Sequence, residues 1–374
     1  MKHLVGSSSM GIGISAFGIV FGAALVGCPE QKTDTHATSE PSKPAVTAAA
    51  TAKPAAVDID PALVKAFGAL PDVFESKENP VTEEKVSLGK ELFYDVRIGS
   101  GDVSCNSCHG LDTYGVDNKK VSEGHKKKLG TRNSPSVYNA AGHFVQFWDG
   151  REPTVEAQAL KPILNPDEMA MPAEKDVLAA IKKDATYAEK FKKAFPGDKD
   201  PVSFANLAKA IGAFERKLVT PAKWDRFAKG DKTAMSADEK AGFKKFVEVG
   251  CVSCHTGPQF GGIMYQKLGL VIPWPKQDDL GRFKVTNKEE DKMMFKVPSL
   301  RNIEKTAPYF HDGSSSDLGE VTKLMAKHQL GKDISDADTA SISTFLKALT
   351  GDIPKDLIAP PAKTGSQPTN LTKK

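Results

Sequence analysis

Cys105-Asn-Ser-Cys108-His109 and Cys251-Val-Ser-Cys254-His255 are two copies of one motif, and together they hold four of the five cysteines in the chain. In Cys-x-x-Cys-His the two sulfurs bond the vinyl groups of a porphyrin, and the histidine ligates its iron. A lone copy could instead be a redox dithiol or half of a zinc site, but a zinc site needs four ligands around one metal. Each copy is a complete attachment site, so the sequence predicts two covalently bound haem c groups.

The overall composition is that of an ordinary globular protein. The 374 residues are 40% hydrophobic and 26% charged, with a formal net charge of +4, and this length has room for two domains. No basic stretch is interleaved with aromatic residues, so we expect no nucleic-acid partner. The lysines are spread along the whole chain, so charge alone indicates no partner.

The first 27 residues have the pattern of a targeting segment. Lys2 and His3 precede an apolar run over residues 10–26, and Cys28 follows directly after Leu-Val-Gly. This pattern resembles a bacterial lipoprotein signal peptide, which would make Cys28 a lipidated residue. The alternative is a plain signal peptide or a membrane anchor with an incidental cysteine, although the run is short and glycine-rich for a spanning helix. We therefore expect a periplasmic protein, lipid-anchored to a bacterial membrane.

The segments that flank the globular part differ from it in composition. Residues 28–58 are rich in Ala, Thr, Pro, Lys and Ser and contain no aromatic residue, which predicts a disordered tether. Residues 361–374 are predicted to form a similar flexible tail. Between them we expect two haem domains, the first over residues 59–220 and the second over residues 221–360.

Helical periodicity dominates these two predicted domains. The stretch from residue 83 to 93 places Leu88 and Leu92 on one face, while Ser236-Ala-Asp-Glu239 has the form of a capping box and Gly250 ends the helix that follows it. Strand-like alternation is scarce. Further helical patterns cover residues 177–191, 204–218, 320–328 and 337–349. A helix leading to each Cys-x-x-Cys-His motif is typical of a class I cytochrome c domain, so the predicted fold is mainly α, with two duplicated cytochrome c-like domains.

Longer motifs surround both attachment sites. The first half contains Tyr114-Gly-Val-Asp-Asn118, Gly124-His125, Arg132-Asn-Ser-Pro135, Gln146-Phe-Trp-Asp-Gly-Arg151, Gln158 and Glu168-Met169. The second half contains Lys296-Val-Pro-Ser-Leu-Arg-Asn-Ile303, Ala307-Pro-Tyr-Phe-His-Asp-Gly313 and Met325 before His328-Gln-Leu-Gly331. Over residues 60–350 the chain resembles the bacterial dihaem cytochrome c peroxidases. The resemblance implies reduction of hydrogen peroxide to water with electrons from a small c-type cytochrome, and a homodimer.

The resemblance also implies roles for residues around the first haem. His109 corresponds to the proximal ligand of the low-potential haem, and His125 to its removable distal ligand. Glu168 corresponds to the active-site carboxylate, which can move a proton between the two oxygens of peroxide, with Gln158 as an orienting amide. Taken without the family, His125 is a solvated loop histidine and Glu168 is part of an acidic turn.

Around the second, high-potential haem the resemblance pairs His255 with Met325. Met264, Met293 and Met294 are competitors for this role, and a methionine is more often core filler than a ligand. Only Met325 has the matching sequence context. A related enzyme that oxidises a partner protein carries Tyr at this position, so Met325 argues against that activity. A methionine ligand raises the reduction potential of a haem.

Three further roles follow from the resemblance. Trp148 would lie between the two haems and shorten the path of the electron, or it is a packed interface tryptophan. Asn133 and the carbonyl groups of Thr306 and Pro308 match a calcium site, because hard oxygen ligands suit this ion. His143 and His311 are expected to be structural residues or contacts of the haem propionates.

A different class of function remains open on the sequence alone. A membrane-anchored periplasmic electron-transfer protein would also need two haems, an anchor and a tether, and could have only incidental peroxidase activity. Glu168 and Gln158 favour the enzyme, because an electron carrier needs neither residue.

Overall fold

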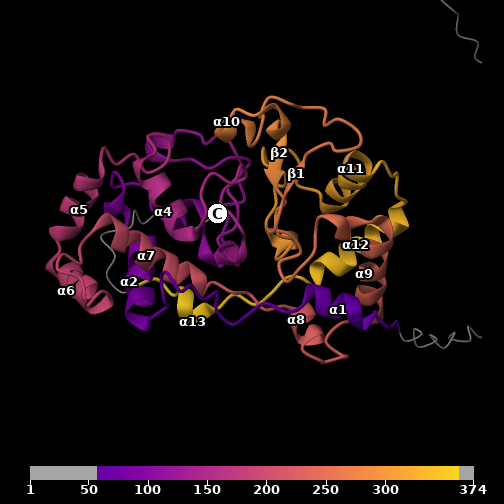
Figure 1. Cartoon of the computed structure of the whole chain (residues 1–374), viewed down its shortest axis with the longest axis horizontal. Helices are drawn as coiled ribbons and strands as arrows, with labels where there is room; N and C mark the ends of the chain where they lie inside the picture. Colours follow the sequence, from indigo (N-terminus) through magenta and orange to yellow (C-terminus); the bar gives the residue numbers. More distant parts are fainter. Residues whose placement is uncertain (1–56, 362–374) are drawn as a thin grey trace, which may run out of the picture. The chain divides into compact units, whose positions relative to one another are not determined.

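The computed structural model describes residues 57–361. This part of the chain is mainly helical, which confirms the mainly α part of the predicted fold class (Figure 1). The signal segment, Cys28, the tether up to residue 56 and the tail from residue 362 lie outside the described residues. No helix among the described residues has both the length and the apolar character needed to span a bilayer. The α-helices are α1 Pro61–Phe67, α2 Glu83–Tyr94, α3 Cys105–Cys108, α4 Val155–Leu164, α5 Glu174–Lys182, α6 Ala185–Ala194, α7 Phe204–Arg216, α8 Lys223–Ala228, α9 Ala237–Val249, α10 Phe283–Thr286, α11 Leu318–Leu330, α12 Asp336–Lys347 and α13 Lys355–Ile358.

The sheet is small and lies in the second half of the chain. Strands β1 (Tyr265–Lys267) and β2 (Met294–Lys296) pair antiparallel, with Tyr265 opposite Lys296. Because β2 leads directly into the Lys296–Ile303 motif, the pairing fixes where that motif begins.

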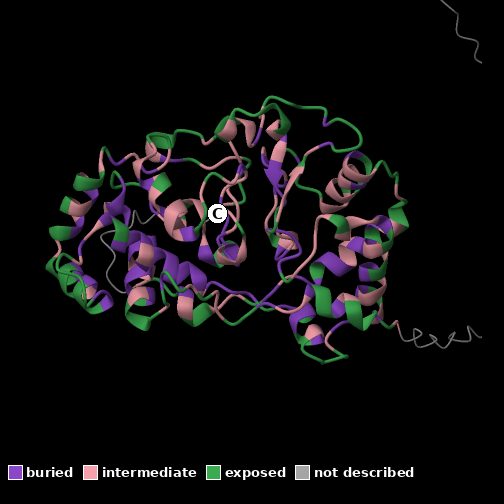
Figure 2. Ribbon diagram, in the orientation of Figure 1, coloured by how far each residue is buried: buried purple, intermediate pink, exposed green. Residues whose placement is uncertain are grey.

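The first hydrophobic core forms around the crossing of α2 and α7. Thr82 caps α2 by accepting a hydrogen bond from the Lys85 amide. The crossing is close because Gly89 has no side chain: a Cβ atom there would lie 1.9 Å from the Ala210 carbonyl oxygen. Almost every residue of α7 is buried, as its colouring in Figure 2 shows. Helix α7 is therefore the centre of this core, and α2, α4 and α6 pack around it and one another.

The second core repeats this arrangement with α9 and α12. The predicted capping box is present, since Ser236 and Glu239 each bond the other's backbone amide, and Gly250 ends α9 in the left-handed conformation (φ +103°). A Cβ atom at Gly242 would lie 2.1 Å from the Ser341 carbonyl oxygen. In each half, a glycine in the helix before the Cys-x-x-Cys-His motif thus permits close contact with a later helix.

Two local predictions need correction. Helix α2 ends at Tyr94, before Cys105, whereas α9 leads directly into Cys251. Buried Asp95 terminates α2, because its carboxylate bonds the Arg97 side chain and the Tyr187 hydroxyl instead of allowing another helical turn. The continuous helix predicted over residues 177–191 is two helices, α5 and α6, since Asp184 caps α6 by accepting from the Thr186 amide.

The two ends of the described chain cross over between the cores. Phe67 of α1 stacks on Phe260 at 4.6 Å within the second core. Ile358 of α13 is buried in the first core, where its carbonyl accepts a hydrogen bond from the Tyr94 hydroxyl at 2.6 Å. Figure 1 shows α1 near α8 and α9, and α13 near α2 and α7. Each core therefore takes a short helix from the opposite end of the chain.

A buried ion pair anchors the Lys296–Ile303 motif to the second core. Both guanidinium nitrogens of Arg301 bond the Asp225 carboxylate, at 2.6 and 3.0 Å, and both side chains are almost fully buried. Asp225 also accepts hydrogen bonds from the Leu70 and Ala222 amides. The pair thus joins three segments that are distant in sequence.

We expect Arg301→Met to lower the free energy of unfolding by about 3–5 kcal/mol, because it leaves a buried carboxylate without its cation. Urea titration of the purified protein measures this change. The matched control is Lys128→Met, which removes a cation from an exposed ion pair with Asp167 and should leave the unfolding midpoint unchanged. Equal effects of the two variants would contradict the prediction.

Candidate haem-binding and active sites

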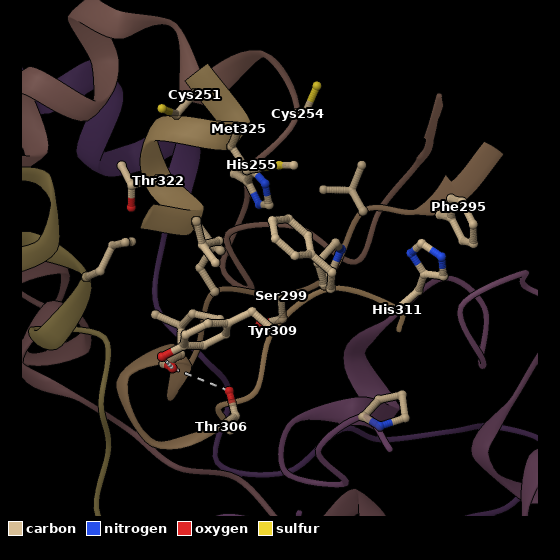
Figure 3. Close-up of a pocket in the computed structure, with 18 of the residues that line it drawn as sticks. Cys251, Cys254, His255, Phe295, Ser299, Thr306, Tyr309, His311, Thr322 and Met325 are labelled. Atoms are coloured by element: carbon tan, nitrogen blue, oxygen red, sulfur yellow. Dashed lines mark hydrogen bonds between the residues drawn. The ribbon is translucent and has the colours of Figure 1, made fainter. Parts of the chain in front are cut away.

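A cavity surrounds the second Cys-x-x-Cys-His motif. Cys251, Cys254, His255 and Met325 all line it, and Figure 3 shows these side chains gathered in one part of its wall. Residues 133–136 of the first half line the same cavity. The two halves of the described chain therefore build this site together.

The two motif histidines are oriented in the same way. The ring nitrogen Nδ1 lies 3.0 Å from the Phe260 carbonyl oxygen in His255 and 3.2 Å from the Gly115 carbonyl oxygen in His109. A protonated Nδ1 that donates to a carbonyl leaves Nε2 with the lone pair that a metal needs. Burial lowers the pKa of both histidines, although the neighbouring carbonyls partly oppose the shift. Burial thus favours the neutral form of both rings.

The cysteines also fit covalent attachment of haem. Cys105, Cys108, Cys251 and Cys254 are free thiols at half-buried positions. Cys105 packs against the first core and Cys251 against the second. Burial raises the pKa of Cys251 to about 11, so the free thiol is neutral at ordinary pH.

A buried cation in the same cavity fits the acidic groups of a haem. Lys296 and His143 both line the cavity, with Lys296 Nζ 3.1 Å from His143 Nδ1. Burial lowers the pKa of Lys296 to about 8, although the charge of Asp149 partly opposes the shift. The buried Nε2 of His143 has no hydrogen-bond partner within the described part of the chain. Haem propionates are anionic acceptors that would satisfy both groups, so the donor set of this cavity fits haem c.

Met325 lines the same cavity as His255. Of the methionines in residues 57–361, Met325 alone lines the cavity that contains His255. Its competitor Met293 is buried with Trp274 and Phe295 in a cluster against which Met325 packs, but Met293, Met264 and Met294 do not line the cavity. Met325 therefore stays the candidate that shares a cavity with His255, and its role as a ligand remains a prediction.

Trp148 joins the two halves of the molecule. Its indole nitrogen donates to the Asn133 carbonyl at 2.9 Å, and its ring lines the cavity of the second motif. Asn133 precedes Pro135, whose carbonyl contacts the ring of His109. Trp148 is thus linked through Asn133 to the segment that contacts His109. It also packs against the same hydrophobic cluster as Met325.

Glu168 and His125 are adjacent in space. The His125 amide donates to the Glu168 carbonyl at 2.6 Å. Burial raises the pKa of the Glu168 carboxyl, although the charge of Arg151 and a 2.8 Å hydrogen bond from the Asn165 side chain partly oppose the shift. The charge of Glu168 also acts on the thiol of Cys108. The structure therefore places a carboxyl group with a raised pKa near the first motif, while Gln158 lies half-buried on α4.

The loop that carries His125 lies directly on the turn that carries Glu168. A Cβ atom at Gly124 would lie 2.0 Å from the Asp167 carbonyl oxygen, so only glycine allows this contact. Lys128 adds an ion pair to Asp167 at 3.1 Å and a hydrogen bond to the Pro166 carbonyl. The Gly124 contact therefore keeps the loop against the turn, whereas the exposed ion pair contributes little.

The three predicted calcium ligands line the same cavity, and the calcium site itself stays a prediction. Asn133, Thr306 and Pro308 all line the cavity of the second motif. The Asn133 side-chain nitrogen donates to the Lys119 carbonyl, which leaves the side-chain oxygen as an acceptor. The donor set of one amide oxygen and two carbonyl oxygens is of the kind that calcium prefers.

Two side-chain contacts of the site could not be predicted from the sequence. Asp102 bonds the ring of His125, and Lys296 bonds the ring of His143. Asp102 stands three residues before Cys105 in a glycine-rich stretch, where a turn is the obvious interpretation. Only the folded chain shows that these side chains face histidines.

Two haem c attachment sites on a mainly helical chain, with a cavity shared by its two halves, define a dihaem c-type cytochrome. Residues 83–233 match the family described as di-haem cytochrome c peroxidase. The chain is 44% identical to cytochrome c551 peroxidase of Nitrosomonas europaea and 41% identical to that of Pseudomonas aeruginosa, over 76% and 77% of this chain and 85% of each relative. The chain belongs to the dihaem cytochrome c peroxidase family.

More distant relatives agree with this assignment. The chain is 38% identical to the methylamine utilization protein MauG of Methylorubrum extorquens, over 81% of this chain and 89% of that protein. Among solved structures, a MauG-like protein associated with microbial copper homeostasis is similar with a TM-score of 0.66 and 29% identity, covering 80% of this chain and 97% of that one. The dihaem peroxidase BthA of Burkholderia thailandensis shares the fold, with a TM-score of 0.62 at 17% identity, over 76% of this chain and 91% of that chain.

Proposed function

We propose that this protein reduces hydrogen peroxide to water in the periplasm, with electrons from a small c-type cytochrome. The observation that carries the proposal is the half-buried carboxyl of Glu168, whose pKa is raised and whose backbone is bonded to that of His125. Membership of the family supports the same activity. A pure electron carrier needs no proton-carrying group at this place, so the observation favours the enzyme.

The proposed ligands and catalytic residues belong to two haem sites. His109 would hold the first iron, and His255 with Met325 would hold the second. When bound, the two haem groups supply two one-electron carriers and an iron position for peroxide. Glu168 would take the proton from the inner oxygen of peroxide and return it to the outer one, while Gln158 orients the substrate. Trp148 would lie between the two centres.

His125 would regulate access to the first site. We infer that it is a removable ligand, which blocks peroxide until the second site has gained one electron. A loop that leaves its resting place after a distant redox change is a known type of switch. The left-handed conformation of Lys126 and Lys127, which are not glycines, shows that this loop carries backbone strain (φ +54° and +59°). Strain of this kind lowers the cost of leaving the resting conformation.

The proposal extends to organisation and partners. We propose two duplicated class I-type haem domains over residues 59–220 and 221–360, except that α1 and α13 each pack in the core of the other domain. The matching pairs Gly89–Ala210 and Gly242–Ser341 and the matching orientation of the two motif histidines support this proposal. We also propose a calcium ion at Asn133, Thr306 and Pro308, a homodimer, and a lipid anchor at Cys28.

Peroxide turnover of the purified dihaem protein, measured fully oxidised and half-reduced with calcium present, tests the function. We expect fast turnover only after one-electron reduction. Fast turnover in both states would support a peroxidase in which His125 does not act as a gate, that is, does not block peroxide before reduction. Negligible turnover in both, with rapid electron exchange to other cytochromes, would instead identify an electron-transfer protein.

His125→Gly tests the gate separately. Because glycine has no ligand to place on the iron, we expect this variant to turn over peroxide without prior reduction, at a rate similar to that of the half-reduced wild-type enzyme. The measurement is the initial rate of peroxide consumption by the oxidised variant. An oxidised variant that stays inactive would show that another group blocks the site.

A further inference from the structure

Asp102 contacts the His125 loop at two points. One carboxylate oxygen lies 2.8 Å from His125 Nδ1, and the other accepts a hydrogen bond from the Lys126 amide at 3.2 Å. The same carboxylate therefore holds both the imidazole ring and the backbone of the loop. The ring itself is largely buried, with 19% of the side chain exposed.

The two partners belong to segments that differ in how they are fixed. Asp102 is followed by buried Val103 and Ser104 and then by Cys105, so it stands on the segment that a covalent haem would fix. His125 stands on the loop that packs against the Glu168 turn. A hydrogen bond from a movable histidine to a fixed carboxylate can determine the resting position of the imidazole ring.

The geometry also selects one ring nitrogen. With Nδ1 donating to Asp102, Nε2 is the only nitrogen of His125 that can bind a metal. A carboxylate behind the ring also makes the imidazole a stronger ligand, and histidines that ligate metals commonly have such a partner. A surface ion pair that served stability alone would contribute little, because Asp102 is almost half exposed.

We propose that Asp102 is the positioning residue for the gate: it orients His125 with Nε2 toward the first iron and strengthens the closed, oxidised state. This inference rests on the proposed function, since it concerns the regulation of the same site. Asp102 acts only through His125 and has no contact with peroxide. Its removal should therefore shift the balance between the closed and the open loop, while the fold is kept.

The test compares Asp102→Asn with wild-type protein, both fully oxidised and free of peroxide. The readout is the fraction of the first haem that is low-spin, from the absorption and electron paramagnetic resonance spectra, with the second haem as internal reference. Loss of a carboxylate partner weakens a histidine–metal bond by about 10–100-fold. We expect a corresponding shift toward a high-spin first haem and a gain of peroxide turnover by the oxidised protein.

Two further variants separate positioning from a merely structural effect. Asp167→Asn removes the carboxylate that pairs with Lys128 on the same loop but has no contact with the His125 ring, and its spectrum should match that of the wild type. In a His125→Gly background, Asp102→Asn should have no spectral effect, because its target is missing.

Several outcomes would overturn the inference. An unchanged spin state in Asp102→Asn would do so, as would a larger low-spin fraction, which would mean that Asp102 holds His125 away from the iron. A wild-type oxidised protein whose first haem is already high-spin would also refute it. Turnover by the half-reduced wild type decides the proposed function independently, so the two can fail separately.

Discussion

Glu168→Gln is expected to lower peroxide turnover by about 10²–10⁴-fold, the usual contribution of a general acid–base group, while both haem spectra stay unchanged. The glutamine side chain has the same shape and can still accept the hydrogen bond that Asn165 donates to Glu168 at 2.8 Å. An amide cannot carry the proton between the two oxygens of peroxide. The variant therefore separates proton transfer from structure.

The burial of Glu168 explains why this position suits the task. Burial raises the pKa of its carboxyl above the ordinary value, so the group can both take and return a proton nearer to neutral pH than an exposed glutamate could. The neighbouring carboxylate of Asp167 is exposed and paired with Lys128.

Asp167→Asn is the matched control for this prediction. It removes an exposed carboxylate from the same turn, one residue away, and turnover by the half-reduced enzyme should stay close to that of the wild type. Steady-state peroxide consumption by the half-reduced enzymes is the measurement. Unchanged turnover in Glu168→Gln would show that Glu168 does not transfer the proton.

Met325→His should lower the reduction potential of the second haem by on the order of 0.2 V, within the roughly 0.8 V range over which axial ligands tune haem iron. Thioether sulfur favours reduced iron, whereas imidazole favours oxidised iron. Since 59 mV is a factor of ten for one electron, uptake of an electron from the donor would become about a thousandfold less favourable. A potentiometric titration followed at the second haem measures the shift.

The control for this variant is Met264→His. Met264 lies near the same strand pair but does not line the cavity of His255, so its replacement should leave the potential of the second haem unchanged. Turnover with a cytochrome donor should fall in Met325→His and remain in Met264→His. Equal potentials in the two variants would mean that Met325 is not the ligand.

The parts of the fold that follow from short-range rules were predictable. The capping box at Ser236 and Glu239 and the left-handed Gly250 define both ends of α9, as expected. These features depend on contacts within a few residues. The same rules failed at Asp184, because a residue that caps a new helix was hidden inside a continuous apolar periodicity.

The site was predictable where its motifs are contiguous and not where it depends on long-range contacts. Met325 could be chosen over Met293 by its sequence context, and the structure places it in the cavity of His255. The partners of two histidines could not be chosen in this way. Asp102 is 23 residues from His125 and Lys296 is 153 residues from His143, and no periodicity links positions so far apart.

The sequence by itself determined the two haem c attachment sites, the mainly helical class and the family, because covalent motifs and helical periodicity are encoded in neighbouring residues. The tertiary structure decided the exchange of α1 and α13 between the two cores, the contact of the His125 loop with the Glu168 turn, and the hydrogen bond of Asp102 to His125. These depend on which buried faces fit one another. Such a fit depends on the shape of the whole packed chain, and a local stretch of sequence carries no information about it.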